Sequence, residues 1–303
     1  MTESKNETPG LIPISEGPPP PQHRYAALVS YMGTRYCGWQ AQLGLDSGKA
    51  QSIQETIQDR LRQMTSESDA KVIGSGRTDA GVHAVGQVIH FKLRRKEWNV
   101  ETLRNGFNSL LPLDIRVLQV KRAPDGFHAQ KSAIRKQYSY FFQQGPSQLP
   151  HLEPFSWWIR KPLDLPAMQR ALDHLLGEQD FKAFQSSGAK VTTTVRTIFE
   201  ARIEPMPIVF PSVPAYRPDR ASRTELVRMR LVGSGFLKQM VRSIAGTLLP
   251  VGEGRAHPDS FREILDGLDR RKAGLTAPGK GLWLEQVWYP DFEFDVDPEV
   301  RNS

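Results

Sequence analysis

The feature that most constrains the fold is the order in which strand-like and helix-like patterns follow one another up to residue 125. The order is strand, helix, strand, strand, helix, strand, over residues 25–31, 52–64, 72–73, 87–93, 99–110 and 115–120. This is the order of a ferredoxin-like unit. The first part of the chain is therefore predicted to be an α+β unit of this kind.

The helix over residues 52–64 carries the strongest local signals. Ser52 and Glu55 have the spacing of a capping box, which marks the first turn of a helix. One apolar face is made by Ile53, Ile57, Leu61 and Met64. In the strand over 88–93, by contrast, Ile89, Phe91 and Leu93 alternate with His90 and Lys92, which predicts a strand that is buried on one face only.

The second part of the chain repeats this theme loosely. Strands are expected at 138–142, 157–159, 196–204, 225–231 and 282–289, and helices at 165–176, 236–249 and 258–268. Five prolines in 205–223 predict an inserted, projecting loop. The expected domains are a disordered Pro-rich arm (1–22), an N-terminal α+β domain (23–125) and a C-terminal α+β domain (126–303) that carries the insertion.

A glycine-rich loop, Gly74-Ser75-Gly76-Arg77-Thr78-Asp79-Ala80-Gly81, links two of the expected strands. Its glycines allow a ligand to approach the backbone, and Asp79 with Arg77 two residues earlier makes it a candidate site. The simplest alternative is a plain turn. A dinucleotide fingerprint is excluded because Asp79 replaces the third glycine, and a Walker loop because no Gly-Lys-Ser/Thr follows.

Composition limits the classes of function. The net charge of +7 and pI of about 9.5, with basic clusters along the whole chain, suit a polyanion bound across a broad surface. The sequence contains no apolar run near the roughly 18 residues of a membrane span and no signal-peptide pattern. A single cysteine, Cys37, excludes an internal disulfide and fits a reducing cytosol, and no Cys or His cluster has metal-ligand spacing.

Seven ordered motifs between residues 24 and 289 resemble one known family. Arg-Thr-Asp-Ala-Gly-Val-His after Gly-x-Gly, at residues 74–83, carries the resemblance furthest. The other motifs are Tyr31 to Gln40, Ser52-Ile53-Gln54, Phe127 to Tyr140, Val195 to Ile198, Gly235 to Arg242 and Ala277 to Leu282. Together they resemble the TruA-type tRNA pseudouridine synthases, which convert uridine to pseudouridine at positions 38, 39 and 40 of the anticodon stem-loop.

The resemblance implies a fold and a set of roles for individual residues. The fold would be two ferredoxin-like halves with antiparallel sheets and a central RNA-binding cleft. Asp79 would be the nucleophile, Arg242 its ion-pair partner, and Arg77 a residue for base extrusion or RNA phosphate. Tyr138 would stack on or hydrogen-bond the target base, and Phe236 and Leu282 would wall its pocket. Trp39 and Gln40 are expected to support the loop, and His83 to fix it through a hydrogen bond.

The expected partners are tRNA and a second copy of the chain, in the cytoplasm, without a metal or another cofactor. A noncatalytic RNA-binding or tRNA-folding protein on the same scaffold remains the alternative, which loss of Asp79 or its arginine would favour. Gln130, Ser243 and Lys280 depart from the family pattern where Arg, Asn and His are usual. These departures affect the expected RNA affinity and site range more than the chemistry.

Overall fold

The computed structural model describes residues 22–40, 51–186, 188, 191–207 and 224–295. The expected Pro-rich arm, apart from residue 22, lies outside the described residues. So does most of the expected loop over 205–223. Two of that loop's residues are described as regular structure, because Pro205 and Met206 continue a strand and pair with Val227 and Leu226.

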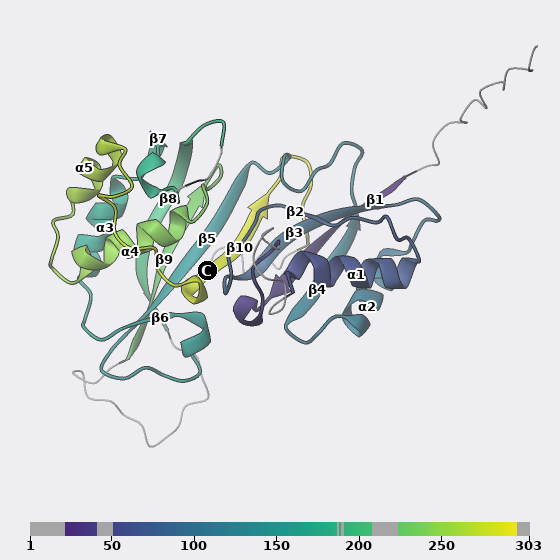
Figure 1. The fold of residues 1–303 in the computed structure, drawn as a ribbon, viewed down its shortest axis with the longest axis horizontal. Helices are drawn as coiled ribbons and strands as arrows, with labels where there is room; N and C mark the ends of the chain where they lie inside the picture. The colour runs from purple at the N-terminus through teal and green to yellow at the C-terminus, as the bar shows by residue number, and fades with distance from the viewer. Residues whose placement is uncertain (1–21, 41–50, 187, 189–190, 208–223, 296–303) are drawn as a thin grey trace, which may run out of the picture.

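The N-terminal half has the expected element order (Figure 1). Its elements are β1 (His23–Tyr31), α1 (Ile53–Thr65), β2 (Ile73–Gly74), β3 (His83–Leu93), α2 (Val100–Leu110) and β4 (Ile115–Arg122). A short 3-10 turn, η1 (Gly33–Arg35), follows β1. The predicted capping box is formed, because the Ser52 side chain accepts from the Glu55 backbone N–H and the Glu55 carboxylate accepts from the Ser52 N–H.

The C-terminal half repeats this order with additions. Its strands are β5 (Arg135–Gln144), β6 (Trp157–Ile159), β7 (Gly177–Asp180), β8 (Val195–Met206), β9 (Glu225–Gly233) and β10 (Leu282–Trp288). Its helices are α3 (Leu165–Asp173), α4 (Met240–Gly252) and α5 (Ser260–Gly267), with 3-10 turns η2 (Glu153–Phe155), η3 (Lys182–Phe184) and η4 (Gly279–Gly281). The edge strand β7 was not predicted, since its polar residues show no alternation.

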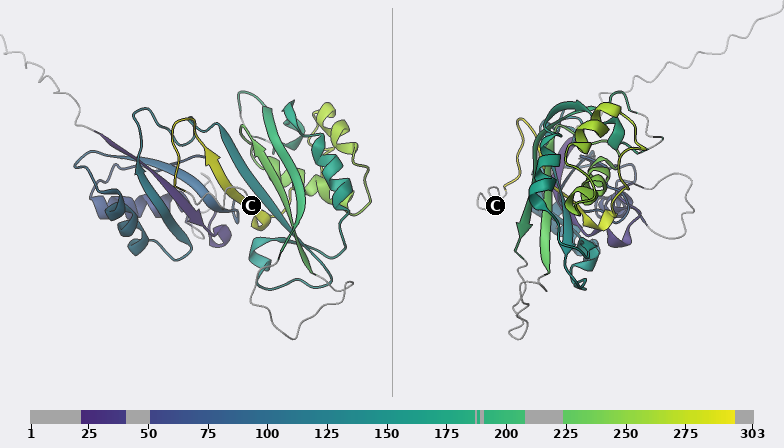
Figure 2. Two further views of the ribbon diagram at one scale, coloured as in Figure 1. Left: turned by 180° about the vertical axis from the view of Figure 1, so that it is seen from behind. Right: turned by 90° about the vertical axis from the view of Figure 1, so that its left-hand side faces the viewer.

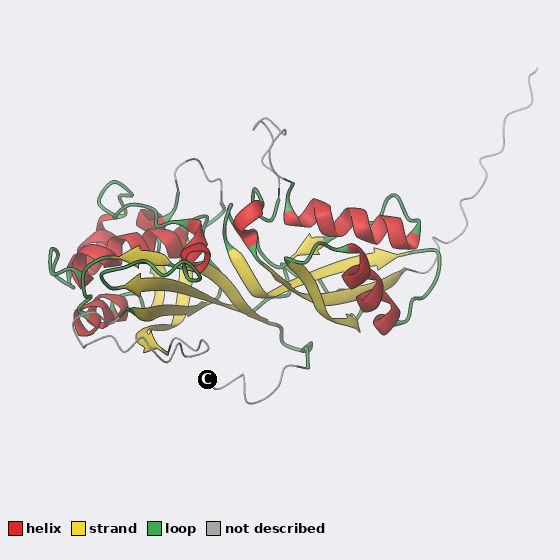
Figure 3. Ribbon diagram, turned by 90° about the horizontal axis from the view of Figure 1, so that it is seen from below, coloured by secondary structure: helices red, strands yellow, loops and turns green. Residues whose placement is uncertain are grey.

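The two halves share one ten-stranded sheet, with the order β4-β1-β3-β10-β5-β9-β8-β7 and with β2 and β6 off this path. Within each half the order is that of a ferredoxin-like sheet: β4-β1-β3 with β2 on β3, and β10-β5-β9-β8. The halves join where β10 runs parallel to β3, with Trp283 opposite His83 and Leu284 opposite Ala84. The helices of both halves lie on one side of this sheet (Figures 2 and 3).

Three predicted elements differ in detail from the structure. The helix expected over 165–176 ends at Asp173. The helix expected from Phe236 begins at Met240, because Gln239 has a left-handed backbone (φ 61°) that stops it from extending backwards. Phe236 is thereby turned towards the sheet, where its ring contacts Tyr138.

The strand expected to be buried on one face only is covered on both faces over much of its length. His90, predicted to be exposed, is 3% exposed. Its Nδ1 accepts a hydrogen bond from the Ala129 N–H at 3.1 Å, and its ring meets the Phe127 ring edge-on. The segment that leads into β5 therefore covers the outer face of β3, a long-range contact that alternation within β3 cannot reveal.

Candidate active site

The loop of residues 74–81 connects β2 to β3 and is fastened at its base by a buried glutamine. Gln87 is fully buried in β3. Its Oε1 accepts from the Ser75 hydroxyl at 2.7 Å, and its Nε2 donates to the Gly76 carbonyl at 3.0 Å. Because both ends of the amide are used, the start of the loop is held in one conformation against the sheet.

A second anchor holds the middle of the loop. The Thr78 hydroxyl shares a 2.8 Å hydrogen bond with the Tyr31 hydroxyl, and the Thr78 carbonyl accepts from the Trp39 N–H at 2.9 Å. Gly38 lies so close that a Cβ there would stand 2.6 Å from the same carbonyl, and its φ of 112° also requires glycine. Trp39 supports the loop as predicted, whereas the other residue expected to do so, Gln40, is exposed.

These anchors present Asp79 to Arg242, in the first turn of α4. Arg242 Nη1 donates to Asp79 Oδ2 at 2.7 Å, although the two residues are 163 positions apart in sequence. Arg242 is itself fixed, because its Nε donates to the Ala277 carbonyl at 2.7 Å. The side chains are 22% (Asp79) and 15% (Arg242) exposed, so the pair is partly shielded from water but remains open to a ligand.

The three predicted pocket residues lie around the same loop. Tyr138 on β5 is 7% exposed, and a Cβ added to Gly76 would stand 3.6 Å from its hydroxyl. The Phe236 ring meets the Tyr138 ring edge-on, with the centroids 5.1 Å apart. Leu282 is buried on β10 and pairs with Tyr140, one alternation further along β5.

Burial raises the pKa of Tyr138, and the Tyr31 hydroxyl and the Asp79 charge raise it further. The phenol is therefore neutral at neutral pH, so it can donate or accept a hydrogen bond but is not a phenolate base in the resting site. The effect of Asp79 on this pKa also indicates that the carboxylate and the phenol lie close enough to sense each other's charge.

Arg77 and His83 are placed differently from each other. Arg77 is exposed and makes no hydrogen bond or ion pair with the described part of the chain, so it does not share Asp79 with Arg242. His83 is fully buried, and its Nδ1 accepts from the Gly33 N–H at 3.2 Å while Nε2 lies 3.0 Å from the Pro154 carbonyl. Burial lowers the pKa of His83 to about 4, so the neutral ring holds these two turns together, as its predicted structural role requires.

Two neighbours of the loop were not predicted as site residues. Lys136 Nζ donates to the Ser75 carbonyl at 2.6 Å. Lys280 forms an ion pair with Glu153 that ties η4 to η2. The alternation of β5 offered a signal for the first, since residues 136 and 138 share one face of a strand.

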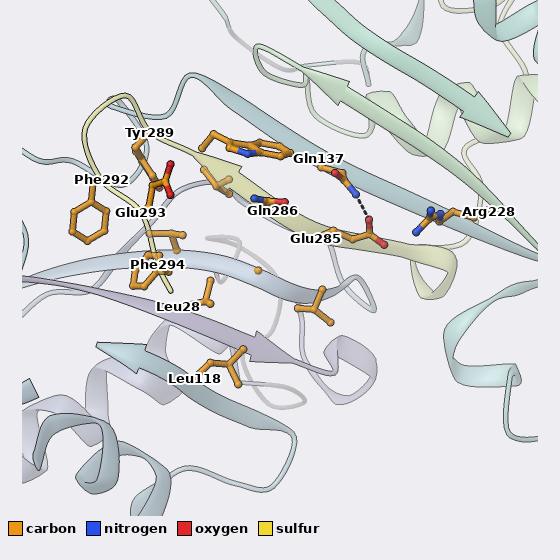
Figure 4. A pocket seen from close by; sticks show the side chains of 15 residues that line it. Leu28, Leu118, Gln137, Arg228, Glu285, Gln286, Tyr289, Phe292, Glu293 and Phe294 are labelled. Atoms are coloured by element: carbon orange, nitrogen blue, oxygen red, sulfur yellow. Dashed lines mark hydrogen bonds between the residues drawn. The ribbon is translucent and has the colours of Figure 1, made fainter. Parts of the chain in front are cut away.

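The opposite face of the sheet contains a separate hollow of about 440 Å³ (Figure 4). Leu28, Leu118 and the aromatic residues Tyr289, Phe292 and Phe294 contribute to its walls. None of the six predicted site residues lines it. Among the described residues, no three or more histidine, cysteine or acidic side chains gather as a metal site would require. No helix of the described chain is both long and apolar enough to cross a bilayer.

Comparison with known proteins was made with families and with curated relatives. A family model described as tRNA pseudouridine synthase matches residues 27–130 and 171–290. The chain is 38% identical over 262 residues to tRNA pseudouridine synthase A of Thermoanaerobacter sp. (strain X514), covering 86% of this chain and 98% of that protein. It is 39% identical to the protein of that name from Bdellovibrio bacteriovorus, over 86% and 93% of the two chains. Identity to the Streptococcus mutans protein is 36%, over 88% and 99%.

Proposed function

The chain belongs to the tRNA pseudouridine synthase family, an isomerase family, and we propose that it acts at positions 38 to 40 of the anticodon stem-loop with Asp79 as its nucleophile. One observation carries the assignment of Asp79. Arg242 binds Oδ2 of the carboxylate, and Oδ1 makes no hydrogen bond with the described residues. The site therefore holds a carboxylate that is charge-balanced on one oxygen and free to react on the other.

The reaction explains why such a carboxylate is needed. Isomerisation breaks the bond between ribose C1′ and uracil N1 and forms a bond between C1′ and C5. C5 gives up its proton and N1 gains one, so the overall change involves no oxidation. A carboxylate can attack the anomeric carbon, as in retaining glycosidases. Attack on C6 of the uracil ring is the other route, and both routes expel the hydrogen of C5.

Tyr138, Phe236 and Leu282 are proposed to hold the base while it is detached and turned. Stacking on an aromatic side chain contributes roughly 1–3 kcal/mol per base. Taking a nucleotide out of its helix costs a few kcal/mol, so this contact offsets much of that cost. The neutral Tyr138 phenol is suited to hydrogen-bond the uracil edge in both of its orientations.

Arg77 is proposed to act on the RNA rather than on Asp79. Its exposed guanidinium leaves the loop two residues before the nucleophile and is not engaged by another described side chain. It can therefore fill the space left by the extruded base or bind a phosphate at the same point.

The proposed assembly is a homodimer in the cytoplasm, built from the domains 23–125 and 126–303. The sheet order supports the division, because each range holds one complete ferredoxin-like set of strands. Exposed apolar side chains beside the hollow of Figure 4, Val85 (44%) and Leu118 (46%), leave apolar area for a second copy. Light scattering on the purified full chain measures the oligomeric state.

The deciding experiment is tritium release from tRNA that carries 5-tritiated uridine. Wild-type protein is expected to release the label, and Asp79→Ala to bind the same tRNA without release. Asp125→Ala replaces an exposed aspartate and serves as the matched control with full activity. Equal release by Asp79→Ala would refute the nucleophile, and binding without release by every protein, wild type included, would favour the tRNA-folding alternative for that tRNA.

A further inference from the structure

Two cationic side chains beside the base pocket have no acidic partner. Lys136 uses one of its three N–H groups on the Ser75 carbonyl, and Arg196 Nη1 donates to the Thr193 carbonyl at 3.0 Å. Neither forms an ion pair with a carboxylate of the described chain. Both therefore retain donors and a full positive charge that no protein group within the described residues neutralises.

The strand register places these two side chains on one face. Lys136 of β5 lies opposite Gly233 of β9, which in turn lies opposite Ile198 of β8. Arg196 precedes Ile198 by two residues and so shares its face of β8. The residue between the two strands is a glycine, so no side chain separates the lysine from the arginine.

The surrounding contacts connect this pair to the pocket. A Cβ added to Gly235 would lie 3.7 Å from Cδ and Nε of Arg196. One residue later the Phe236 ring contacts Tyr138. On the other side, a Cβ added to Gly76 would lie 3.4 Å from Lys136 Nζ and 3.6 Å from the Tyr138 hydroxyl. The two cations thus border the aromatic pocket from β5 and β8.

Electrostatics shows that the pair is costly in the free protein. Burial lowers the pKa of Lys136 to about 8, and the positive charge of Arg196 lowers it further in the same direction. Like charges held together without a counter-ion repel each other, and a bound anion would relieve that repulsion. At neutral pH the lysine remains mostly protonated, so an anion meets two positive charges.

We propose that Lys136 and Arg196 form a phosphate subsite, which holds a phosphodiester of the RNA strand beside the nucleotide whose base enters the Tyr138 pocket. Lysine supplies a point charge and arginine a two-pronged donor, the combination that suits a phosphate group. The inference rests on the proposed function, because it assumes that the pocket receives a uridine of an RNA strand.

The test uses a synthetic anticodon stem-loop RNA in which single phosphates around the target uridine are replaced by neutral methylphosphonates. Binding and tritium release are measured for wild type, Lys136→Met, Arg196→Met and the double variant. Arg202→Met, an exposed cation further along β8, is the matched control. Lys136→Arg keeps the charge and is expected to retain most of the affinity.

Each single variant is expected to bind the unmodified RNA about tenfold more weakly, with a salt dependence lower by about 0.7 in log–log slope per lost phosphate contact. Wild type is expected to lose affinity for one particular methylphosphonate, and the double variant to show no further loss there. The rate at saturating RNA should stay within a few-fold of wild type, because the charge acts on binding rather than on the reacting bond.

Two results would overturn the subsite. One is a fall in the saturated rate of Lys136→Met with unchanged affinity and salt slope, which would show that the lysine only positions the Ser75 carbonyl. The other is a double variant that still distinguishes every methylphosphonate as wild type does. Failure of the proposed function is separate, since it appears as absent tritium release from wild type, whereas the subsite is decided by binding.

Discussion

Arg242→Met tests whether the ion pair at the centre of the site serves catalysis or only the fold. The substitution removes two hydrogen bonds of 2.7 Å, one to Asp79 Oδ2 and one to the Ala277 carbonyl. It also leaves the Asp79 carboxylate without its cation in a site that is only partly open to water. Both the stability of the protein and its reaction rate are expected to fall.

The size of the stability change follows from these contacts. A hydrogen bond to a charged group contributes roughly 1.5–3 kcal/mol, and partial exposure of both side chains reduces the electrostatic share. We expect a loss of about 2–4 kcal/mol in the free energy of unfolding, which thermal unfolding would register as a melting temperature lower by several degrees. Single-turnover tritium release is expected to slow by about a hundredfold or more, the scale found when a preorganised charge contact is removed.

Arg228→Met is the matched control for this experiment. Arg228 Nε and Nη2 both donate to Glu204 Oε1, at 2.9 and 2.6 Å, and its side chain is 12% exposed. It therefore loses the same number of hydrogen bonds at a place between β8 and β9, away from Asp79. The expected result is a comparable loss of stability with an unchanged rate.

Arg242→Lys separates the charge from the second contact, because lysine can reach the carboxylate but cannot also bind the Ala277 carbonyl as the guanidinium does. An intermediate rate is expected. If Arg242→Met lost stability like the Arg228 control while releasing tritium at the wild-type rate, the pair would be structural and the assignment of Asp79 as a nucleophile poised by Arg242 would be refuted.

Two further predictions concern the supports of the loop. Burial lowers the pKa of His83 to about 4, below its unfolded value of about 6.5, so its contribution is complete above pH 6.5 and is lost as the pH falls towards 4, by up to about 3 kcal/mol. Denaturant unfolding of His83→Gln, which also weakens the contact to the Gly33 N–H, should show a shallower loss of stability over that range; an unchanged slope would contradict this. Gly279→Ala would bring a Cβ to 2.4 Å from the Ala80 carbonyl and should slow tritium release, whereas Gly267→Ala, with no atom nearer than 3.7 Å, should leave the rate unchanged.

Local chemistry explains which parts of the fold could be predicted from the sequence. The helix α1 is specified within one segment, because its capping box and its apolar face require no distant partner. The glycine-rich loop is equally local, and its motif pointed to Asp79 before any contact was known. Expected strands such as β4 and β9 likewise carry their own alternation.

The missed features depend on distant contacts. The edge strand β7 exists because β8 supplies its hydrogen bonds, with Gly177 opposite Ile198 and Asp180 opposite Val195. α3 stops at Asp173 although the apolar spacing continues, since Leu175 is buried from a turn as completely as it would be from a helix. Periodicity reports burial, and burial does not require that the helix continue.

The site itself arises from the way the two halves meet. Asp79 belongs to the first half, and Arg242 and Ala277 belong to the second. The parallel contact of β3 with β10 sets the halves edge to edge, which brings the loop before β3 against the turn before β10. In that turn, Gly279 allows the backbone to pass directly beneath the Ala80 carbonyl. The distance between Asp79 and Arg242 is therefore controlled by this junction, and any change that separates the halves there would uncouple the carboxylate from its cation before it altered either side chain.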